Sequence, residues 1–309
     1  MEVMLTLGQS TPTQAQGRRE PYRRDEGVPP ENISSRLAAA ASSCSPGCVA
    51  ARPNPCCDIY FSAWTEYEGH DLMFPPFYCH FPGGKLWPLS NDGLWDVRMV
   101  HSRDGEHFSY IAGDRAPILS RGSWGGPPTR TNYEAPPNSD WDSSEISILP
   151  GMIVRGDKIR MMKFGTEVRH GQEHLVGSDG RPIPSGGLVA IEWRLDGFGS
   201  MSTTALGGNG EGEFTTQPFT FTGSELQLNC DVRGGGFLRV EIQNAAGTAH
   251  HGLAANDSLP IVGSFVNRTA VWRSKGSAER RSSVGNLVGN PVRLRFVMAA
   301  ADLYSFRFV

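Results

Sequence analysis

A segment of alternating residues, interrupted by tight-turn signals, constrains the fold of this chain most strongly. Residues 141–171 read WDSSEISILPGMIVRGDKIRMMKFGTEVRHG. Leu149–Gly151 and Arg155–Asp157 contain the glycine, proline and aspartate that favour turns, and the runs around them alternate as strands do. Three short antiparallel strands are therefore predicted. A meander of this size cannot bury both of its faces by itself, so it must belong to a larger β structure.

The rest of the chain has a similar character. It is 309 residues long, with 37 glycines, 22 prolines and 39% hydrophobic residues. This balance is typical of turn-rich β structure with some unstructured segments. Strand patterns recur in residues 188–198, 226–232, 237–243 and 292–298, and no segment has the period of a helix. An all-β fold is predicted, and the length accommodates one or two domains.

Changes in composition divide the chain into three regions. Residues 1–52 are rich in Pro, Gln, Ser and Ala and lack an apolar period, as unstructured tails do. Residues 53–180 contain aromatic strand candidates separated by turns and long loops. Residues 181–309 contain about six half-buried strands with short turns, a pattern that predicts an antiparallel β-sandwich.

Charge and hydropathy exclude some classes of partner. The net charge of −3 gives no basis for binding nucleic acid or a membrane surface. No apolar run approaches the roughly 20 residues that a membrane-spanning helix needs. The amino terminus lacks the basic and apolar regions of a secretory signal. No compartment is predicted.

The six cysteines do not have the spacing of a metal site. Zinc sites pair their thiolates closely and place further ligands along the chain. Here five of the six cysteines lie in the first part of the chain without two such pairs, at Cys44, Cys48, Cys56, Cys57 and Cys79. Free thiols or a local disulfide are the expected states, and neither a metal nor a cofactor is predicted.

Residues 102–108, SRDGEHF, have the form of a specific hairpin turn. In such a turn Asp104 accepts hydrogen bonds from turn amides, Gly105 supplies a positive φ, and Phe108 packs between sheets. The segment resembles the hairpin turn repeated in sugar-processing propellers. Asp104 is therefore predicted to be structural rather than catalytic.

Three segments carry a resemblance to a known family: Asp96–Gly105, Pro150–Asp157 and Arg194–Phe198. They resemble invertase-type and arabinanase-type glycoside hydrolases, and more closely bacterial relatives of glycoside hydrolase family 32. The last strands, Gly289–Phe308, resemble the sandwich that follows the catalytic domain in such proteins. The likeness covers roughly residues 57–309. It implies a five-bladed propeller whose pocket holds an Asp nucleophile, a Glu general acid and a stabilising Asp.

The resemblance also implies that the propeller is truncated at its front. A blade takes about 40 to 45 residues, so the available segment holds about three. The family keeps its nucleophile in an Asn-Asp-Pro setting, which Asn91–Gly93 does not reproduce, and its Arg-Asp-Pro and Glu-Cys motifs have no counterpart. We predict a partial, about three-blade β-propeller over residues 53–180 and a β-sandwich over 181–309. Open blade edges predict self-association.

The candidate site combines carboxylates with aromatic and polar side chains. Retaining glycosidases need two carboxylates about 5 Å apart. Asp58, Asp96 and Glu145 each lie at or near the start of a strand, and Glu145 is the preferred acid. Substrate binding requires groups that stack on sugar rings or bond their hydroxyls. The candidates for this role are Trp64, Trp95, Arg169 and His170.

Two functions stay open at this point. The resemblance implies hydrolysis of fructosides or arabinosides by paired carboxylates. The alternative is a non-catalytic carbohydrate-binding or structural β protein in which a degenerate propeller serves as scaffold. Carboxylates that converge in one pocket would favour the first function, and an open sheet without converging acids would favour the second. Carbohydrate is the predicted partner.

Overall fold

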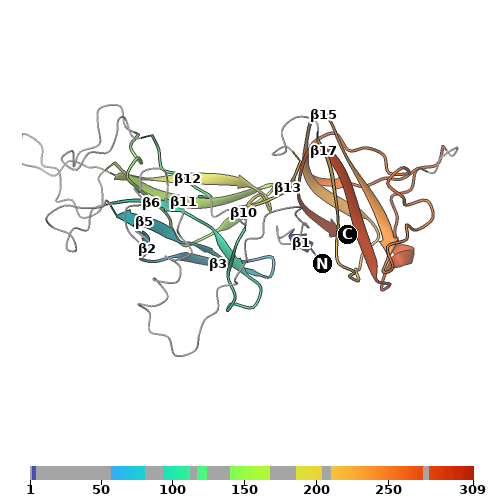
Figure 1. Cartoon of the computed structure of the whole chain (residues 1–309), viewed down its shortest axis with the longest axis horizontal. Helices are drawn as coiled ribbons and strands as arrows, with labels where there is room; N and C mark the ends of the chain where they lie inside the picture. Colours follow the sequence, from blue (N-terminus) through green and yellow to red (C-terminus); the bar gives the residue numbers. More distant parts are fainter. Residues whose placement is uncertain are drawn as a thin grey trace, which may run out of the picture. The chain divides into compact units, whose positions relative to one another are not determined.

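The structure, a computed structural model, consists of β-strands and short connections in every part that it describes. It describes residues 2–4, 57–80, 93–111, 117–123, 140–167, 186–203, 210–273 and 278–309. The chain divides into two compact units, residues 16–192 and residues 193–309 with 1–15. The helix found in these described ranges is a short 3-10 turn, η2 (Gly285–Leu287), and none of their helices could cross a membrane (Figure 1). The predicted all-β class is confirmed.

The first unit is built on three long antiparallel passes of chain that are interrupted midway. The first pass consists of β2 (Cys57–Ile59) and β3 (Ala63–Tyr67). The second consists of β4 (His70–Phe74) and β5 (Pro76–His80), and the third of β6 (Gly93–Val97) and β7 (Val100–Ser102). In the second and third passes, Asp71 lies opposite Ser102 on one side of the break and Pro76 lies opposite Val97 on the other. The pairing register of these two passes is therefore the same on both sides of the break. The passes therefore run from one sheet into another.

Proline explains why these passes break where they do. Pro75 separates β4 from β5, and a proline cannot donate a ladder hydrogen bond. Its carbonyl accepts a hydrogen bond from the Arg98 amide at 3.0 Å, which links the second and third passes at the break. On one side of the break, β3, β4, β7 and β8 (Ser109–Tyr110) form a four-stranded sheet. On the other side, β2, β5 and β6 enter a seven-stranded sheet.

The segment 145–166 forms one long hairpin rather than the predicted three-strand meander. Its strands are β9 (Glu145–Ile148), β10 (Ile153–Arg155) and β11 (Lys158–Thr166). Both β9 and β10 pair with β11, and the Leu149 amide donates to the Met162 carbonyl between them at 2.9 Å. The predicted reversal at Leu149–Gly151 is wrong. Pro150 removes one donor and Gly151 has φ of 110°, which interrupts the strand as a bulge does without reversing it.

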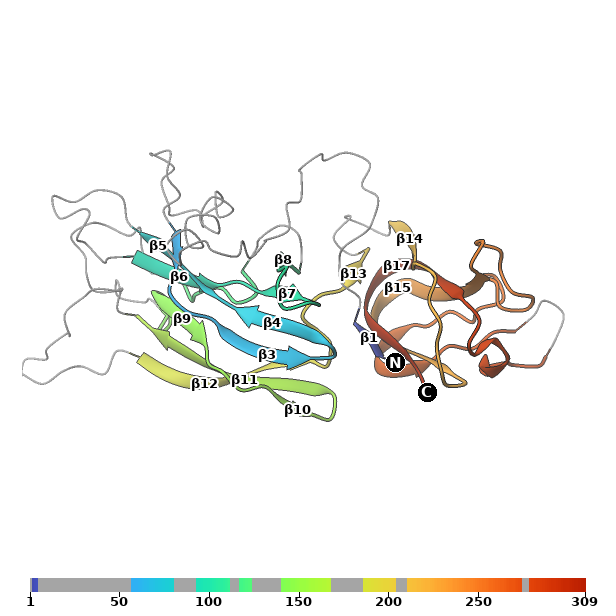
Figure 2. The same cartoon turned by 90° about the horizontal axis from the view of Figure 1, so that it is seen from below.

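A single parallel contact joins this hairpin to the long passes. Trp95 of β6 lies opposite Glu145 of β9, and the Trp95 amide donates to the Ser144 carbonyl at 3.1 Å. The strand order is β10, β11, β9, β6, β5, β2, and β12 (Gly186–Arg194) also pairs with β11 (Figure 2). The predicted propeller is not confirmed. In a propeller each blade is a separate sheet of about four strands, whereas here the strands expected in consecutive blades belong to one seven-stranded sheet.

The predicted structural turn at residues 102–107 is confirmed. The Asp104 carboxylate accepts hydrogen bonds from the amides of Glu106 and His107 at 2.9 and 2.8 Å and from the Ser102 hydroxyl at 2.8 Å. The amide bonds from His107 and Glu106 hold the pKa of Asp104 well below its usual range. Gly105 has φ of 72°. Asp104 therefore closes the connection between β7 and β8.

The second unit is one six-stranded sheet built on two very long strands. β15 (Leu226–Asn244) and β17 (Val292–Phe308) pair along their length. Shorter strands complete the sheet: β1 (Glu2–Met4), β13 (Met201–Ser202), β14 (Glu211–Thr215) and β16 (Gly263–Thr269). Because its described strands form one sheet, a sandwich of two separate sheets is not confirmed. β1 lies in the predicted tail, whose other residues, 1 and 5–52, are outside the described residues.

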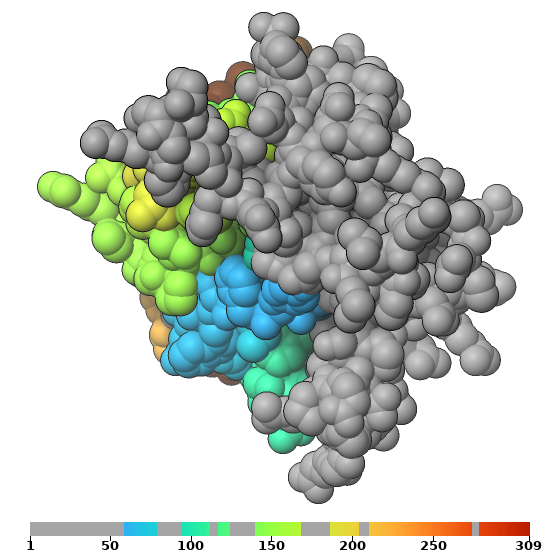
Figure 3. All heavy atoms as spheres, turned by 90° about the vertical axis from the view of Figure 1, so that its left-hand side faces the viewer, coloured from blue at the N-terminus to red at the C-terminus, as the bar shows by residue number. Residues whose placement is uncertain are grey.

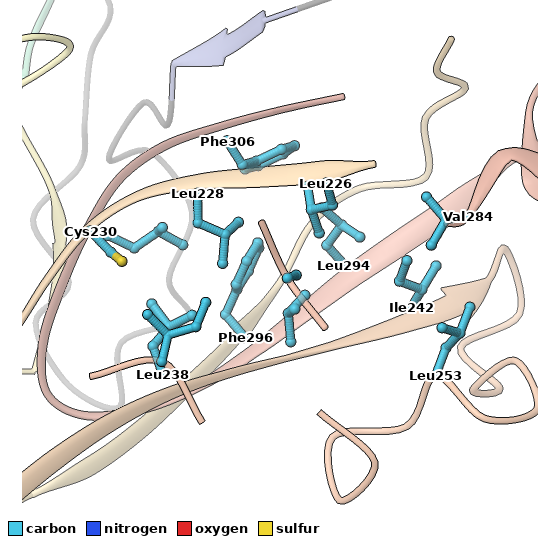
Figure 4. Packing of buried hydrophobic residues seen from close by; sticks show 14 of the residues in the cluster. Leu226, Leu228, Cys230, Leu238, Ile242, Leu253, Val284, Leu294, Phe296 and Phe306 are labelled. Carbon is cyan, nitrogen blue, oxygen red and sulfur yellow. The ribbon is translucent and has the colours of Figure 1, made fainter. Parts of the chain in front are cut away.

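A glycine bend in β15 lets its two halves contribute to one core. The register with β17 shifts between Val232 and Phe237. A Cβ on Gly236 would lie 2.3 Å from the Ala299 carbonyl oxygen, so only glycine fits against β17 there. Side chains from both halves of β15 meet in the core shown in Figure 4. They include Leu226, Leu228 and Cys230 from the first half and Leu238 and Ile242 from the second.

The Arg194–Phe198 turn is fixed to this sheet through its charged side chains. Arg194 donates to the Asn229 carboxamide at 2.5 Å, to the Ser264 hydroxyl at 2.8 Å and to the carbonyls of Cys230 and Phe265. Asp196 is buried, has φ of 54° and accepts a bond from the Ser305 hydroxyl at 2.5 Å. This family-like segment has a structural role in this chain.

Truncation of the core aromatic Phe296 should strongly destabilise the second unit. The Phe296→Ala variant should lose about 3 to 5 kcal/mol in free energy of unfolding, because it removes a fully buried ring and leaves a cavity. Urea unfolding monitored by circular dichroism measures the loss. Val262→Ala, at an exposed valine, should change stability by less than about 0.5 kcal/mol. Equal effects of the two variants would contradict the core assignment.

Two histidines lie together on the inner face of the four-stranded sheet. The His70 side chain is buried, and the His70 and His101 ring centroids are 5.6 Å apart. Burial lowers the pKa of both histidines, that of His101 to about 4, and the positive charge of Arg103 acts in the same direction. Both imidazoles are therefore neutral at neutral pH.

The histidine pair should make the first unit sensitive to acid. An unfolded histidine binds its proton near pH 6.5, whereas folded His101 does so near pH 4. The stabilising contribution is therefore complete above pH 6.5 and is lost as the pH falls toward 4. Unfolding by urea at about pH 7.5 and pH 5 should show a smaller loss for His101→Gln than for the wild type. His251→Gln, at an exposed histidine, should keep the wild-type loss.

Candidate functional site

One row of residues crosses the seven-stranded sheet at a single level. Asp58 lies opposite Tyr78, Tyr78 opposite Trp95, Trp95 opposite Glu145, and Glu145 opposite Thr166. Directly opposed residues in a sheet point to the same face. The side chains of Tyr78, Trp95 and Glu145 therefore share one face, although these residues are far apart in the sequence.

Two further aromatic residues pack against this row from the connection between β2 and β3. The Tyr60 ring centroid lies 5.2 Å from that of Tyr78 and 5.8 Å from that of Trp95, and Phe61 lies 5.9 Å from Trp95. Tyr60 and Phe61 are each 45% exposed, whereas Tyr78 and Trp95 are buried. The cluster of Tyr60, Phe61, Tyr78 and Trp95, here called the aromatic cluster, has a solvent-facing rim and a buried floor.

Glu145 lies at the buried side of the aromatic cluster. Its side chain is 7% exposed, and burial raises its pKa to about 8, while a hydrogen bond from the Trp95 side chain acts in the opposite direction. At neutral pH this carboxyl is mainly protonated and can both donate and accept hydrogen bonds. A carboxyl kept neutral in apolar surroundings is the usual state of a general acid in glycosidases.

Asp96 lies on the opposite face of the sheet from Glu145. It follows Trp95 in β6, and consecutive strand residues point to opposite faces. Its carboxylate accepts bonds from the Arg121 amide at 3.0 Å and from the Arg121 guanidinium at 3.2 Å. The structure therefore does not bring Asp96 and Glu145 together. Asp96 anchors the segment that contains Arg121 to β6.

The other predicted site residues lie elsewhere or outside the described residues. Between the Asp58 and Glu145 backbones there are three strand spacings, roughly 14 Å, and the side chain of Asp58 is outside the described part. Arg169 and His170 also lie outside the described residues. Trp64 is on β3 of the four-stranded sheet, where it is exposed and donates from its indole to Asp71 at 2.8 Å. Trp95 is the substrate-binding candidate that the structure places beside Glu145.

A buried ion pair holds the turn that leads into Glu145. Lys163 of β11 bonds to the Asp142 carboxylate, and both side chains are buried. The Lys163 ammonium also lies 5.5 Å from the centre of the Trp141 ring. The Ser144 amide donates to the Thr166 carbonyl at 3.0 Å, which ties the start of β9 to β11. These contacts position Glu145 in its row.

Sequence reasoning missed Tyr60 and Phe61, which form the rim. Both residues lie in the region of aromatic strand candidates, residues 53–180, and alternation alone would place them on opposite faces of one strand. The structure instead has a break after Ile59, so both side chains reach Trp95. The dense aromatic composition of this segment was the available signal. In the described ranges no group of three or more His, Cys, Asp or Glu could hold a metal ion.

Comparisons with known proteins give only remote similarities. No family model and no curated protein matches the chain. A glycoside hydrolase family 43 arabinoxylan arabinofuranohydrolase from Bacillus subtilis, solved with cellotetraose, is 11% identical, with a TM-score of 0.21; the match covers 80% of this chain and 53% of that one. A family 32 beta-fructofuranosidase from Bombyx mori is 10% identical, with a TM-score of 0.19 and coverage of 81% and 66%. Similarities this low establish neither fold nor function.

Replacement of Glu145 by glutamine should improve stability at alkaline pH. The folded pKa of about 8 lies above the ordinary value of 4.5. The neutral carboxyl therefore contributes stability that is complete below pH 4.5 and is lost as the pH rises through 8. Urea unfolding between about pH 6 and pH 9.5 should show this loss in the wild type and in Glu66→Gln, at an exposed glutamate, but not in Glu145→Gln. A wild-type profile without this loss would contradict the burial of Glu145.

Proposed function

We propose that this chain binds carbohydrate on the face of the seven-stranded sheet that carries Glu145. The observation that supports this proposal is the aromatic cluster, whose half-exposed rim of Tyr60 and Phe61 adjoins the buried, neutral carboxyl. Aromatic faces pack against the apolar faces of sugar rings, and a few polar groups set orientation. The rim supplies the stacking surface, and Glu145 supplies a hydrogen-bond donor and acceptor for a sugar hydroxyl.

Glycoside hydrolysis, on a fructoside or arabinoside by the resemblance, is the second candidate. The pKa of Glu145, raised to about 8, favours it, because a general acid must carry its proton at working pH. Glycosidases also need a second carboxylate, about 5 Å away in retaining enzymes and about 6.5 to 9.5 Å away in inverting ones. In the described residues Asp96 is on the other face and the Asp58 backbone is three strands away. Binding is therefore the better supported function.

Sugar binding should depend on the rim of the aromatic cluster. Fructo-, arabino-, xylo- and gluco-oligosaccharides would be titrated against the full-length chain by calorimetry. Phe61→Ala and Tyr60→Ala should each weaken binding by about tenfold, because each removes a stacking surface. Trp64→Ala, at an exposed aromatic of the four-stranded sheet, is the matched control and should keep wild-type affinity. A folded, monodisperse wild type that binds none of these sugars would refute the proposal.

The same samples separate binding from hydrolysis. Aryl fructosides and arabinosides report turnover by release of the phenol. Under the hydrolase alternative Glu145→Gln should abolish turnover and retain sugar affinity within a few fold, because the amide keeps the shape but cannot donate the proton. Turnover that survives this substitution would exclude Glu145 as the acid. Binding without turnover in the wild type would establish the non-catalytic function.

A further inference from the structure

Exposed apolar side chains gather on three neighbouring strands of the first unit. Of the twelve large hydrophobic residues exposed in the described ranges, five lie on β10, β11 and β12: Ile153, Val154, Met162, Leu188 and Val189. Leu188 is 58% exposed. Figure 3 shows this yellow-green and yellow region at the molecular surface. Because consecutive strand residues point to opposite faces, Leu188 and Val189 expose apolar groups on both faces of β12.

β12 is an edge strand of this sheet among the strands that the structure describes. β12 pairs with β11, and no other described strand pairs with it (Figure 2). Residues 186–191 of this nine-residue strand, GGLVAI, contain neither a charge nor a proline. Proteins usually protect such edges with charges, prolines, bulges or a covering segment. Within the described residues none of these features protects residues 186–191, so this edge is available for pairing with another strand.

We propose that the edge of β12 pairs antiparallel with β12 of a second copy of this chain. The only charged side chain between Leu188 and Trp193 is Glu192, and it is bonded to Arg160 of its own chain at 2.5 Å. Two copies can therefore approach along this edge without opposing like charges. In a two-fold pair centred on Ala190, Val189 of each copy lies opposite Ile191 of the other, and the small Ala190 lies opposite itself.

The chemistry of the edge favours a second copy over a charged partner. An acidic or basic peptide would find no uncompensated charge on residues 186–192, because the Arg160–Glu192 pair is internally neutral. A second β12 offers the same neutral, apolar strip, and a two-fold contact satisfies both open edges at once. β11 lies between β12 and Glu145 on β9, so this inference does not rest on the proposed sugar site.

Sedimentation equilibrium of the full-length chain over about 1 to 100 μM tests this pairing, because a dimer must depend on concentration. The wild type should have the mass of a dimer at the upper end of this range. Val189→Lys should raise the dissociation constant at least about 100-fold, because it places two buried charges at the edge. Val262→Lys, at an exposed valine of the second unit, is the matched control and should leave the dimer intact.

Cross-linking at the two-fold centre gives a second measurement if Val189→Lys fails to fold. A short bis-maleimide should join Ala190→Cys chains into covalent dimers, whereas Val262→Cys should show only the background of the native cysteines. A wild type that is monomeric throughout the concentration range would overturn the proposal. A dimer that Val189→Lys leaves unchanged, or Ala190→Cys chains that do not cross-link above background, would also overturn it.

Discussion

The contact between Trp95 of β6 and Glu145 of β9 joins the two halves of the large sheet in the first unit. On one side of it lie the long passes that bend at Pro75, and on the other side lies the hairpin of β9, β10 and β11. The same contact places a carboxyl beside buried aromatic rings. Fold and candidate site therefore depend on one interaction, and the Asp142–Lys163 ion pair supports it by holding the turn before β9.

Three carboxyl groups near this contact have different partners because their surroundings differ. Asp96 and Asp142 are bonded to Arg121 and Lys163, so each buried negative charge is compensated. Breaking one such pair typically costs about 3 to 5 kcal/mol, because it leaves a buried charge without a partner. Burial in the aromatic cluster instead raises the pKa of Glu145 and keeps it neutral. The group best suited to donate a proton is thus the carboxyl that burial keeps neutral.

Local sequence signals predicted the strands and turns of this fold better than they predicted which strands pair with each other. Alternation and turn residues identify the all-β class, and the chemistry of residues 102–107 identifies the role of Asp104, because both depend on neighbours in the chain. The reversal predicted at Leu149–Gly151 was wrong because Pro-Gly marks bulges as well as turns, and the choice depends on the long β11. Glu145 was selected from the sequence, but its aromatic surroundings were not, since they depend on strand pairing over long distances. The second carboxylate could not be assigned for the same reason.

The segments that carry the resemblance to glycoside hydrolases are largely structural in this chain. Arg194 and Asp196 fix a turn to the second unit, Asp104 closes a hairpin, and Asp96 binds Arg121. Such residues are required wherever strands meet at tight turns. A resemblance based on them therefore indicates a β structure with similar turns more than it indicates a shared catalytic activity. A catalytic or binding role is better inferred from a group whose burial lowers the stability of the fold and is not explained by a structural role. Glu145 meets this criterion, because a buried carboxyl loses its hydration while the strand pairing around it uses only backbone groups.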